Sequence, residues 1–84
     1  MADPVIAGSV TIDEDGGASG DGVALQMFQA RSAARDVVYA AMPSFGFPNA
    51  TRPTNDRTWA VGVAAECNEL APLWIATIQA MIDA

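Results

Sequence analysis

The sequence predicts a mainly α-helical fold with a short N-terminal strand arm, an acidic glycine-rich turn and a two-helix hairpin. Apolar residues recur at helical spacing in two long segments, residues 22–42 and 58–83. A run rich in β-branched residues occupies residues 5–12 and alternates between two faces, as a strand does. With 84 residues, the whole of 1–84 is expected to form one small domain.

The first segment, residues 1–12, is predicted to be a strand arm. Pro4 lies at its start, where no ladder hydrogen bond is needed. No second run in the sequence has a convincing strand pattern, and Pro48 argues against one in FGFPNAT. A lone strand leaves its N–H and C=O groups unpaired. We therefore expect the arm either to pair with a strand of another subunit or to remain a loose extension.

Residues 13–22 form the acidic glycine-rich turn, and TIDEDGGASGDG holds four acids and four glycines in twelve residues. An EF-hand calcium loop needs acids at positions one, three and five and a glutamate at twelve. Asp13 and Asp15 fit the first two positions, but Gly17 occupies the fifth and no glutamate follows at the twelfth. A phosphate would be repelled by the acids. We interpret the segment as a turn without a metal or cofactor, leaving open a calcium ion held between subunits.

The helical hairpin is predicted to occupy residues 23–84. Asp21 is the expected N-cap of its first helix, and Pro43 ends that helix. Arg31 and Arg35 lie four residues apart, and one or the other is expected to pair with acids of a neighbouring subunit. Seven residues are expected to fill the core between the helices: Leu25, Phe28, Val38, Val63, Leu70, Trp74 and Ile78.

A proline-rich loop, residues 43–56, joins the two helices. Phe45 and Phe47 in this loop either pack into the core or contact a partner. Asn55 or Asp56 is expected to cap the second helix. Pro72 lies within that helix and removes a backbone hydrogen bond, so we expect the helix to kink or to break there.

Composition excludes several classes of function. The net charge of -6 and the absence of lysine argue against binding nucleic acid. The longest apolar stretch is shorter than a membrane span. Because histidine is absent and Cys67 is the only cysteine, a structural zinc site and an intrachain disulfide are not expected, and Cys67 is predicted to be a buried thiol. No serine has an evident base, and Glu66 and Glu69 suit a solvated helix face. We expect no enzyme.

One resemblance adds to this reasoning. The segment IAGSVTIDEDGGASGDGVALQMFQA, residues 6–30, combines a GSVTI strand, an Asp15-Gly16 turn, a Gly20-x-Gly22 step and an alanine-rich helix that begins with VALQMF. It resembles the opening of small structural proteins of tailed bacteriophages. The resemblance implies a virion component of the tail, baseplate, neck or fibre region, present in several symmetric copies. It transfers no functional residues.

The expected function is that of a non-enzymatic structural subunit of a phage particle, made in the host cytoplasm and assembled into the virion. At 51% apolar and 17% charged residues, the chain has more apolar surface than a small globule can bury, which favours a homo-oligomer that also contacts other virion proteins. Strand pairing and apolar helix faces would form the contacts. The alternative is a small intracellular adaptor or inhibitor, acting as a monomer on a different protein. The expected interface residues are Val5, Ile6, Val10, Ile12, Phe45, Phe47, Trp59 and Trp74.

Overall fold

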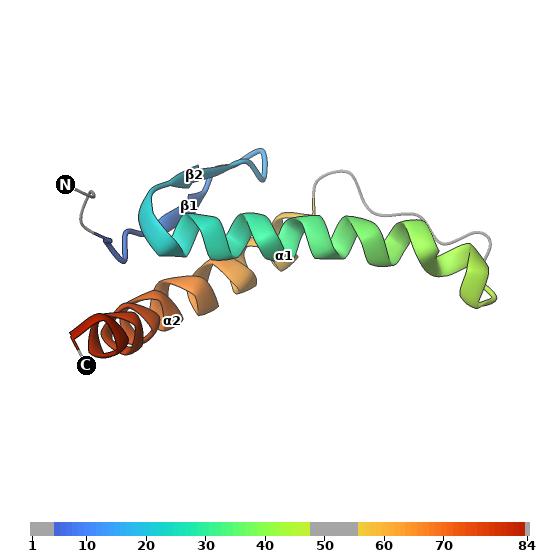
Figure 1. Ribbon diagram of the computed structural model, residues 1–84. Helices are drawn as coiled ribbons and strands as arrows, with labels where there is room; N and C mark the ends of the chain where they lie inside the picture. Colours follow the sequence, from blue (N-terminus) through green and yellow to red (C-terminus); the bar gives the residue numbers. More distant parts are fainter. Residues whose placement is uncertain (1–4, 48–55, 84) are drawn as a thin grey trace.

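The computed structural model describes residues 5–47 and 56–83. Its elements follow one another as a β-hairpin, a long helix, a short 3₁₀ helix and a second long helix. In chain order they are β1 (Val10–Ile12), β2 (Ala18–Gly20), α1 (Gly22–Ala41), η1 (Met42–Phe45) and α2 (Arg57–Asp83). Figure 1 shows the hairpin lying along the first half of α1, with α2 crossing that region. The prediction of a mainly α-helical fold is confirmed.

The expectation that the N-terminal strand has no partner in its own chain is wrong. β1 pairs with β2 in an antiparallel hairpin, with Val10 opposite Gly20 and Ile12 opposite Ala18. The partner strand lies inside the segment predicted to be only a turn. Its sequence, Ala-Ser-Gly, has neither the β-branched nor the aromatic residues that mark a strand, so tertiary context and not propensity decides its conformation. The paired part of the arm is three residues long.

The turn of the hairpin is organised by Asp13. The Asp13 carboxylate accepts hydrogen bonds from the backbone N–H groups of Asp15 and Gly17, at 2.9 and 2.8 Å. The Asp13 N–H in turn donates to the Gly17 carbonyl at 2.9 Å. Aspartate favours such turns because its side chain satisfies backbone donors two to four residues ahead. The acids of TIDEDGGASGDG thus include the residue that closes the hairpin.

The segment before β1 caps the start of α1. The Val23 N–H donates to the Ile6 carbonyl at 3.0 Å, and the Ala24 N–H donates to the Ala7 carbonyl at 2.9 Å. These are two of the N–H groups that a helix start leaves without an intrahelical partner. Asp21 occupies the N-cap position as predicted, but its side chain makes no cap bond and instead accepts from the Ser9 N–H at 3.3 Å.

Two glycines allow this close approach of the N-terminal segment to the helix start. Gly8 and Gly22 have φ angles of 62° and 67°, in the left-handed region that favours glycine. A Cβ at Gly8 would lie 2.1 Å from the Asp21 carbonyl oxygen, and one at Gly22 would lie 2.6 Å from the Ile6 carbonyl oxygen. Neither position has room for a side chain.

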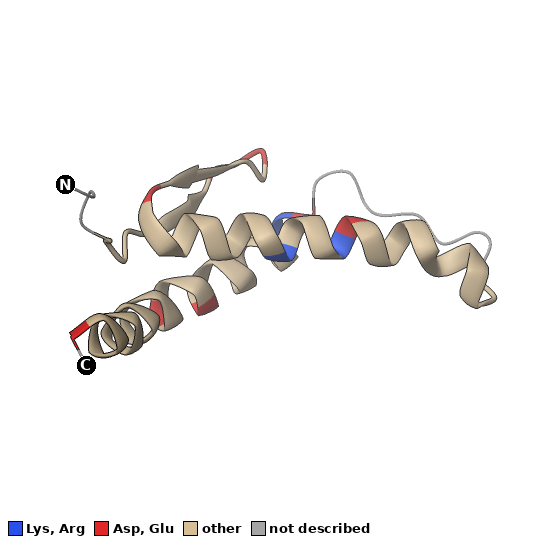
Figure 2. Cartoon of the chain, in the orientation of Figure 1, with Lys and Arg blue, Asp and Glu red and all other residues tan. Residues whose placement is uncertain are grey.

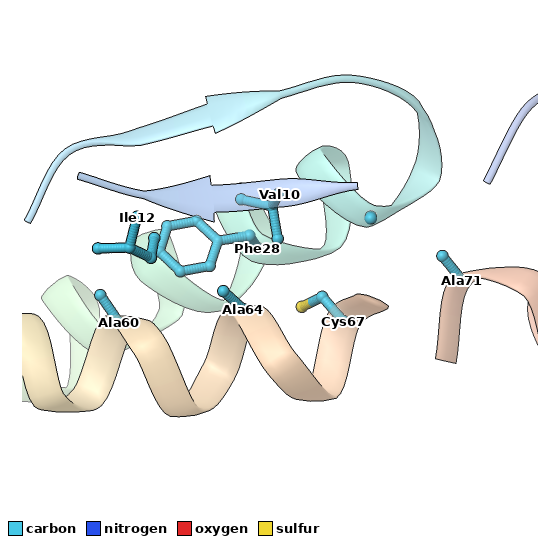
Figure 3. Close-up of a cluster of buried hydrophobic side chains, with 8 residues drawn as sticks. Val10, Ile12, Phe28, Ala60, Ala64, Cys67 and Ala71 are labelled. Atoms are coloured by element: carbon cyan, nitrogen blue, oxygen red, sulfur yellow. The ribbon is translucent and has the colours of Figure 1, made fainter. Parts of the chain in front are cut away.

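The core lies where the hairpin, α1 and α2 meet. Figure 3 shows Val10 and Ile12 pointing from β1 toward α2, with Phe28 of α1 beside them. Small side chains on α2 allow this close packing. The buried residues are Val10, Ile12, Ala24, Phe28, Ala60, Ala64, Cys67 and Ala71.

The predicted core is only partly correct. Phe28 is buried, and Leu25 and Val63 pack against its edge. Val38 and Trp74 are about half exposed, so their assignment to the core is wrong. Both lie after the last buried residue of their helix, Phe28 in α1 and Ala71 in α2, and the far ends of the two helices diverge (Figure 1). The helical stripe itself was therefore insufficient to locate the core, because the crossing point decides which part of each stripe is covered.

The molecule is elongated. Its radius of gyration is 15.7 Å and its extents are 49 × 30 × 22 Å. A compact domain of this length has a radius of gyration of about 12 Å. The free halves of α1 and α2 account for the difference, and α2 runs through Pro72 without a break.

Candidate interaction surfaces

Arg35 is held inside its own chain. Its guanidinium forms an ion pair with Asp56 at 2.9 Å and lies over the ring of Trp59, 4.4 Å from the centroid. Trp59 also contacts Phe28, with ring centroids 5.9 Å apart. This cluster joins the middle of α1 to the start of α2. The expectation that Arg35 pairs with an acid of a neighbouring subunit is therefore wrong.

Asp56 caps α2, as the sequence predicts for Asn55 or Asp56. Its carboxylate accepts a hydrogen bond from the Trp59 N–H at 3.2 Å. That bond, together with the hydrogen bond and charge of Arg35, holds the pKa of Asp56 below its ordinary value, although burial opposes the effect. The ionised form of Asp56, which accepts both hydrogen bonds, is therefore favoured.

A cavity of about 370 Å³ lies between this cluster and the hairpin turn. Asp15 and Ala18 line it from the hairpin, and Ser32 and Arg35 line it from α1. Arg35 and Asp56 neutralise each other in its wall, and neither is placed as an acid or base for the Ser32 hydroxyl by any contact in the structure.

Arg31 and Arg57 also have partners within the chain. Arg31 donates a hydrogen bond to the Cys67 sulfur at 2.8 Å, and Cys67 is fully buried, as predicted. Arg57 donates from Nε to the Asp13 carbonyl at 2.9 Å and so ties the start of α2 to the hairpin turn. All three described arginines therefore stabilise contacts between elements of the fold.

Asn68 covers the open edge of β1. The alternation of hydrogen bonds along the hairpin makes the backbone groups of Val10 point away from β2. The Asn68 side chain accepts from the Val10 N–H at 2.8 Å and donates to the Val10 carbonyl at 3.0 Å. A single side-chain amide thus forms both bonds that a neighbouring strand would form. This position is closed to strand pairing with another subunit.

The far end of α1 carries the first exposed apolar surface, here called the α1-end surface and formed by Val37, Val38, Phe45 and Phe47. Between 50 and 71% of each residue is exposed. Residues 37–47 contain no charged side chain, and Figure 2 shows this end of the molecule without acid or base. Phe45 and Phe47 therefore do not pack into the core.

The C-terminal half of α2 carries the second surface, here called the α2-tail face and formed by Leu70, Leu73, Trp74, Thr77 and Met81. These residues share one side of the helix because they are spaced three or four apart. Leu73, Trp74 and Met81 are 52–73% exposed. Leu70, Leu73, Trp74 and Thr77 line a shallow groove of about 170 Å³.

The predicted interface residues are divided by the structure. Val5, Ile6, Phe45, Phe47 and Trp74 are exposed. Val10 and Ile12 are buried in the chain's own core, which corrects their assignment to an interface. Trp59 is half-buried in the Arg35 cluster.

Sequence reasoning missed five exposed residues of these surfaces: Val37, Val38, Leu73, Thr77 and Met81. The adjacent pair Val37 and Val38 was a usable signal, because two consecutive residues on a helix point about 100° apart and a narrow stripe cannot bury both. No pattern indicated the role of Asn68.

Comparison of this chain with protein-family models, with curated proteins and with solved structures finds no match. The described helices include none with the length and hydropathy needed to span a membrane. Within residues 5–47 and 56–83, no group of three or more acids or cysteines is placed to hold a metal ion. The α1-end surface and the α2-tail face are therefore the features of this chain that bear on its function.

Proposed function

We propose that this chain is a non-enzymatic structural subunit of a tailed-phage particle that assembles through exposed apolar helix surfaces. The observation that carries the assembly role is the contrast between what is buried and what is exposed. Eight apolar residues are buried, and four of them are alanine. Eleven larger apolar residues are exposed in the described part of the chain. The assignment to a phage particle is supported by the resemblance of residues 6–30 to small structural proteins of tailed phages.

The energetics favour assembly over an isolated monomer. Complete burial of one Val, Leu, Phe or Met side chain contributes about 1.5–3 kcal/mol. The α1-end surface alone offers four such exposed residues within eleven residues of the chain, and a concentration of exposed apolar residues favours an interaction site. The alanine-rich core offers less, since an alanine buries only one methyl group.

The α1-end surface is the proposed contact between copies of the chain. Residues 37–47 are uncharged, so two copies can meet there without bringing like charges together. A twofold contact uses the same patch on both subunits and needs such a self-compatible surface. Strand pairing through β1 is not proposed as a contact between copies, because β2 and Asn68 occupy the two edges of β1 at Val10.

The test of self-assembly is the solution mass of the purified chain, measured by light scattering after size exclusion over a range of concentrations. We expect a defined oligomer. The double variant Val37→Ser/Phe45→Ser should be monomeric with an unchanged helical circular dichroism spectrum. Gln29→Ser, an exposed substitution on the same helix two turns before Val37, is the matched control and should keep the wild-type mass.

A chain that stays monomeric at all concentrations would contradict self-assembly and favour the adaptor or inhibitor. The assignment to a particle has its own test, which is mass spectrometry of purified phage particles from cells that express the chain. We expect the chain at a fixed ratio to the other particle proteins. Its absence from particles, while it is abundant in the lysate, would overturn that assignment.

A further inference from the structure

The α2-tail face has a distinct charge pattern. Residues 70–82 contain no charged side chain and extend over about 20 Å of helix. Glu66 lies one turn before Leu70 on the same side, and Glu69 lies one turn before Leu73. Asp83 ends the helix. The apolar strip is therefore bordered by acids at its N-terminal end, and Asp83 follows its other end on the opposite side of the helix; Figure 2 shows these acids along α2.

A second copy of this chain is poorly suited to cover that strip. Two α2 tails placed side by side in parallel bring Glu66 and Glu69 of one copy against the same acids of the other. In the antiparallel arrangement these acids face the uncharged end of the strip and meet no basic partner. The described arginines cannot relieve this repulsion without giving up contacts in the fold. Arg31 is bound to Cys67, Arg35 to Asp56 and Arg57 to the Asp13 carbonyl. Arg52 lies outside the described residues.

We propose that the α2-tail face docks an amphipathic helix of a different protein, whose apolar stripe is flanked by arginine or lysine. Leu73, Trp74 and Met81 would contact the apolar stripe, and the groove beside Trp74 would take one large apolar side chain. Glu66 and Glu69 would pair with the basic flank of the partner. Arginine suits such edge positions because it pairs with carboxylates through two parallel bonds.

This inference deepens the proposed function by giving the chemistry of one partner, and it does not depend on self-assembly. The two proposals use different surfaces at opposite ends of the molecule (Figure 1). Loss of the oligomer through Val37 and Phe45 and loss of partner binding through Trp74 are therefore separate results.

The test uses two fluorescein-labelled helical peptides and the full chain. Both peptides have leucine at positions i, i+3, i+4, i+7 and i+11. One has lysine and arginine at its two ends, and the other has glutamate at the same positions. Fluorescence anisotropy should show the basic peptide binding at least tenfold more tightly than the acidic one. This preference should decrease as salt is added, because salt screens exposed charge pairs.

Variants connect binding to the face. Trp74→Ala should weaken binding of the basic peptide at least tenfold. Glu66→Gln/Glu69→Gln should keep the apolar contact but lose most of the preference for the basic peptide. Val37→Ala, an exposed apolar substitution on the other surface, is the control and should bind like the wild type. Circular dichroism of each variant checks that the fold is kept.

Three results would overturn the proposal. Equal affinity for the two peptides, or no binding of either, would contradict the pairing of Glu66 and Glu69 with a basic partner. A drop in the solution mass of the chain alone in Trp74→Ala would show that a second copy covers the face. Binding to phosphatidylcholine vesicles with Trp74 shielded from an aqueous quencher would show that the face meets a lipid surface.

Discussion

Asp56 joins two functions at a single residue, since one carboxylate oxygen caps α2 and the other pairs with Arg35. Both contacts are stronger with the charged form of the carboxyl group. They connect the middle of α1 to the start of α2 across the loop between the helices. The same pair explains why only about a tenth of the Arg35 side chain is exposed.

We predict that stability falls in acid because of Asp56. The pKa of Asp56 is lowered in the folded chain, first by the Trp59 N–H and then by Arg35. A lowered folded pKa adds stability above the unfolded value, about 3.9, and that stability is lost as pH falls through the folded pKa. Urea unfolding between pH 7 and pH 2 should show this decrease. Asp56→Asn should be less stable at pH 7 and should lose part of the decrease.

The control for the acid prediction is Glu14→Gln, because Glu14 is exposed on the hairpin turn. It should keep the acid dependence of the wild type. An Asp56→Asn profile parallel to that of the wild type over the whole pH range would contradict the assignment to Asp56.

Asn68 is predicted to be the most sensitive exposed polar residue of α2. Asn68→Ala leaves the Val10 N–H and carbonyl without their partner. Loss of hydrogen bonds to a partly buried backbone costs about 1–3 kcal/mol. Chemical denaturation should show a decrease of that size. Gln29→Ala, at an exposed position of α1, should change the unfolding free energy by less than about 0.5 kcal/mol.

At the level of the elements, the hairpin and α1 are one unit, because the segment before β1 supplies carbonyl acceptors for the start of α1. The helix start is thus satisfied by the backbone and not by the side chain of Asp21. The arrangement depends on two glycines that bring the two backbones together, and a pair of glycine variants tests it.

We predict opposite effects for Gly22→Ala and Gly62→Ala. At Gly22 the φ angle is positive and a Cβ would lie 2.6 Å from the Ile6 carbonyl oxygen, so alanine should lower the unfolding free energy by more than about 1 kcal/mol. At Gly62, in the middle of α2, a Cβ meets nothing within 4 Å. Alanine at residue 62 should raise the unfolding free energy by about 0.5–1 kcal/mol. Equal changes in the unfolding free energy of the two variants, measured by thermal or urea unfolding, would show that the start of α1 does not depend on close contact with the N-terminal segment.

At the scale of the whole molecule, a small core supports two long projecting helix ends. Every buried residue of α2 lies between Ala60 and Ala71. Residues 72–83 of α2 therefore contribute little to the stability of the fold and mainly form exposed surface. The elongated shape follows from this division, because neither helix end is covered by another part of the described chain.

A truncation tests this division. A chain that ends at residue 75 should keep cooperative unfolding and lose about 1–2 kcal/mol, since Ile78 is only half-buried and little else of the core is removed. It should also bind the basic peptide more weakly, because Thr77 and Met81 of the α2-tail face are removed while Trp74 and the two glutamates remain. A chain that ends at residue 63 lacks Ala64, Cys67 and Ala71 and should not fold. A residue-75 truncation without a cooperative urea transition would show that the tail is part of the core.

The sequence by itself determined the two helices, the turn after the first strand, a cap at Asn55 or Asp56 and the burial of Cys67. Each depends on local chemistry: helical periodicity, glycine and aspartate in a turn, a carboxylate before a helix, and an apolar thiol on a helix stripe. These signals come from residues close together in the chain, so the structures they predict do not depend on contacts with distant segments.

Only the tertiary structure decided which parts of the stripes are buried. The strand partner at Ala18–Gly20 has no propensity of its own and forms because β1 is already held against α2 by Val10, Ile12 and Asn68. The place where α1 and α2 cross separates the buried Phe28 from the exposed Val38, and Ala71 from Trp74. Periodicity gives the face of a helix but not how far along it a neighbour reaches, because that length depends on contacts between residues far apart in the chain.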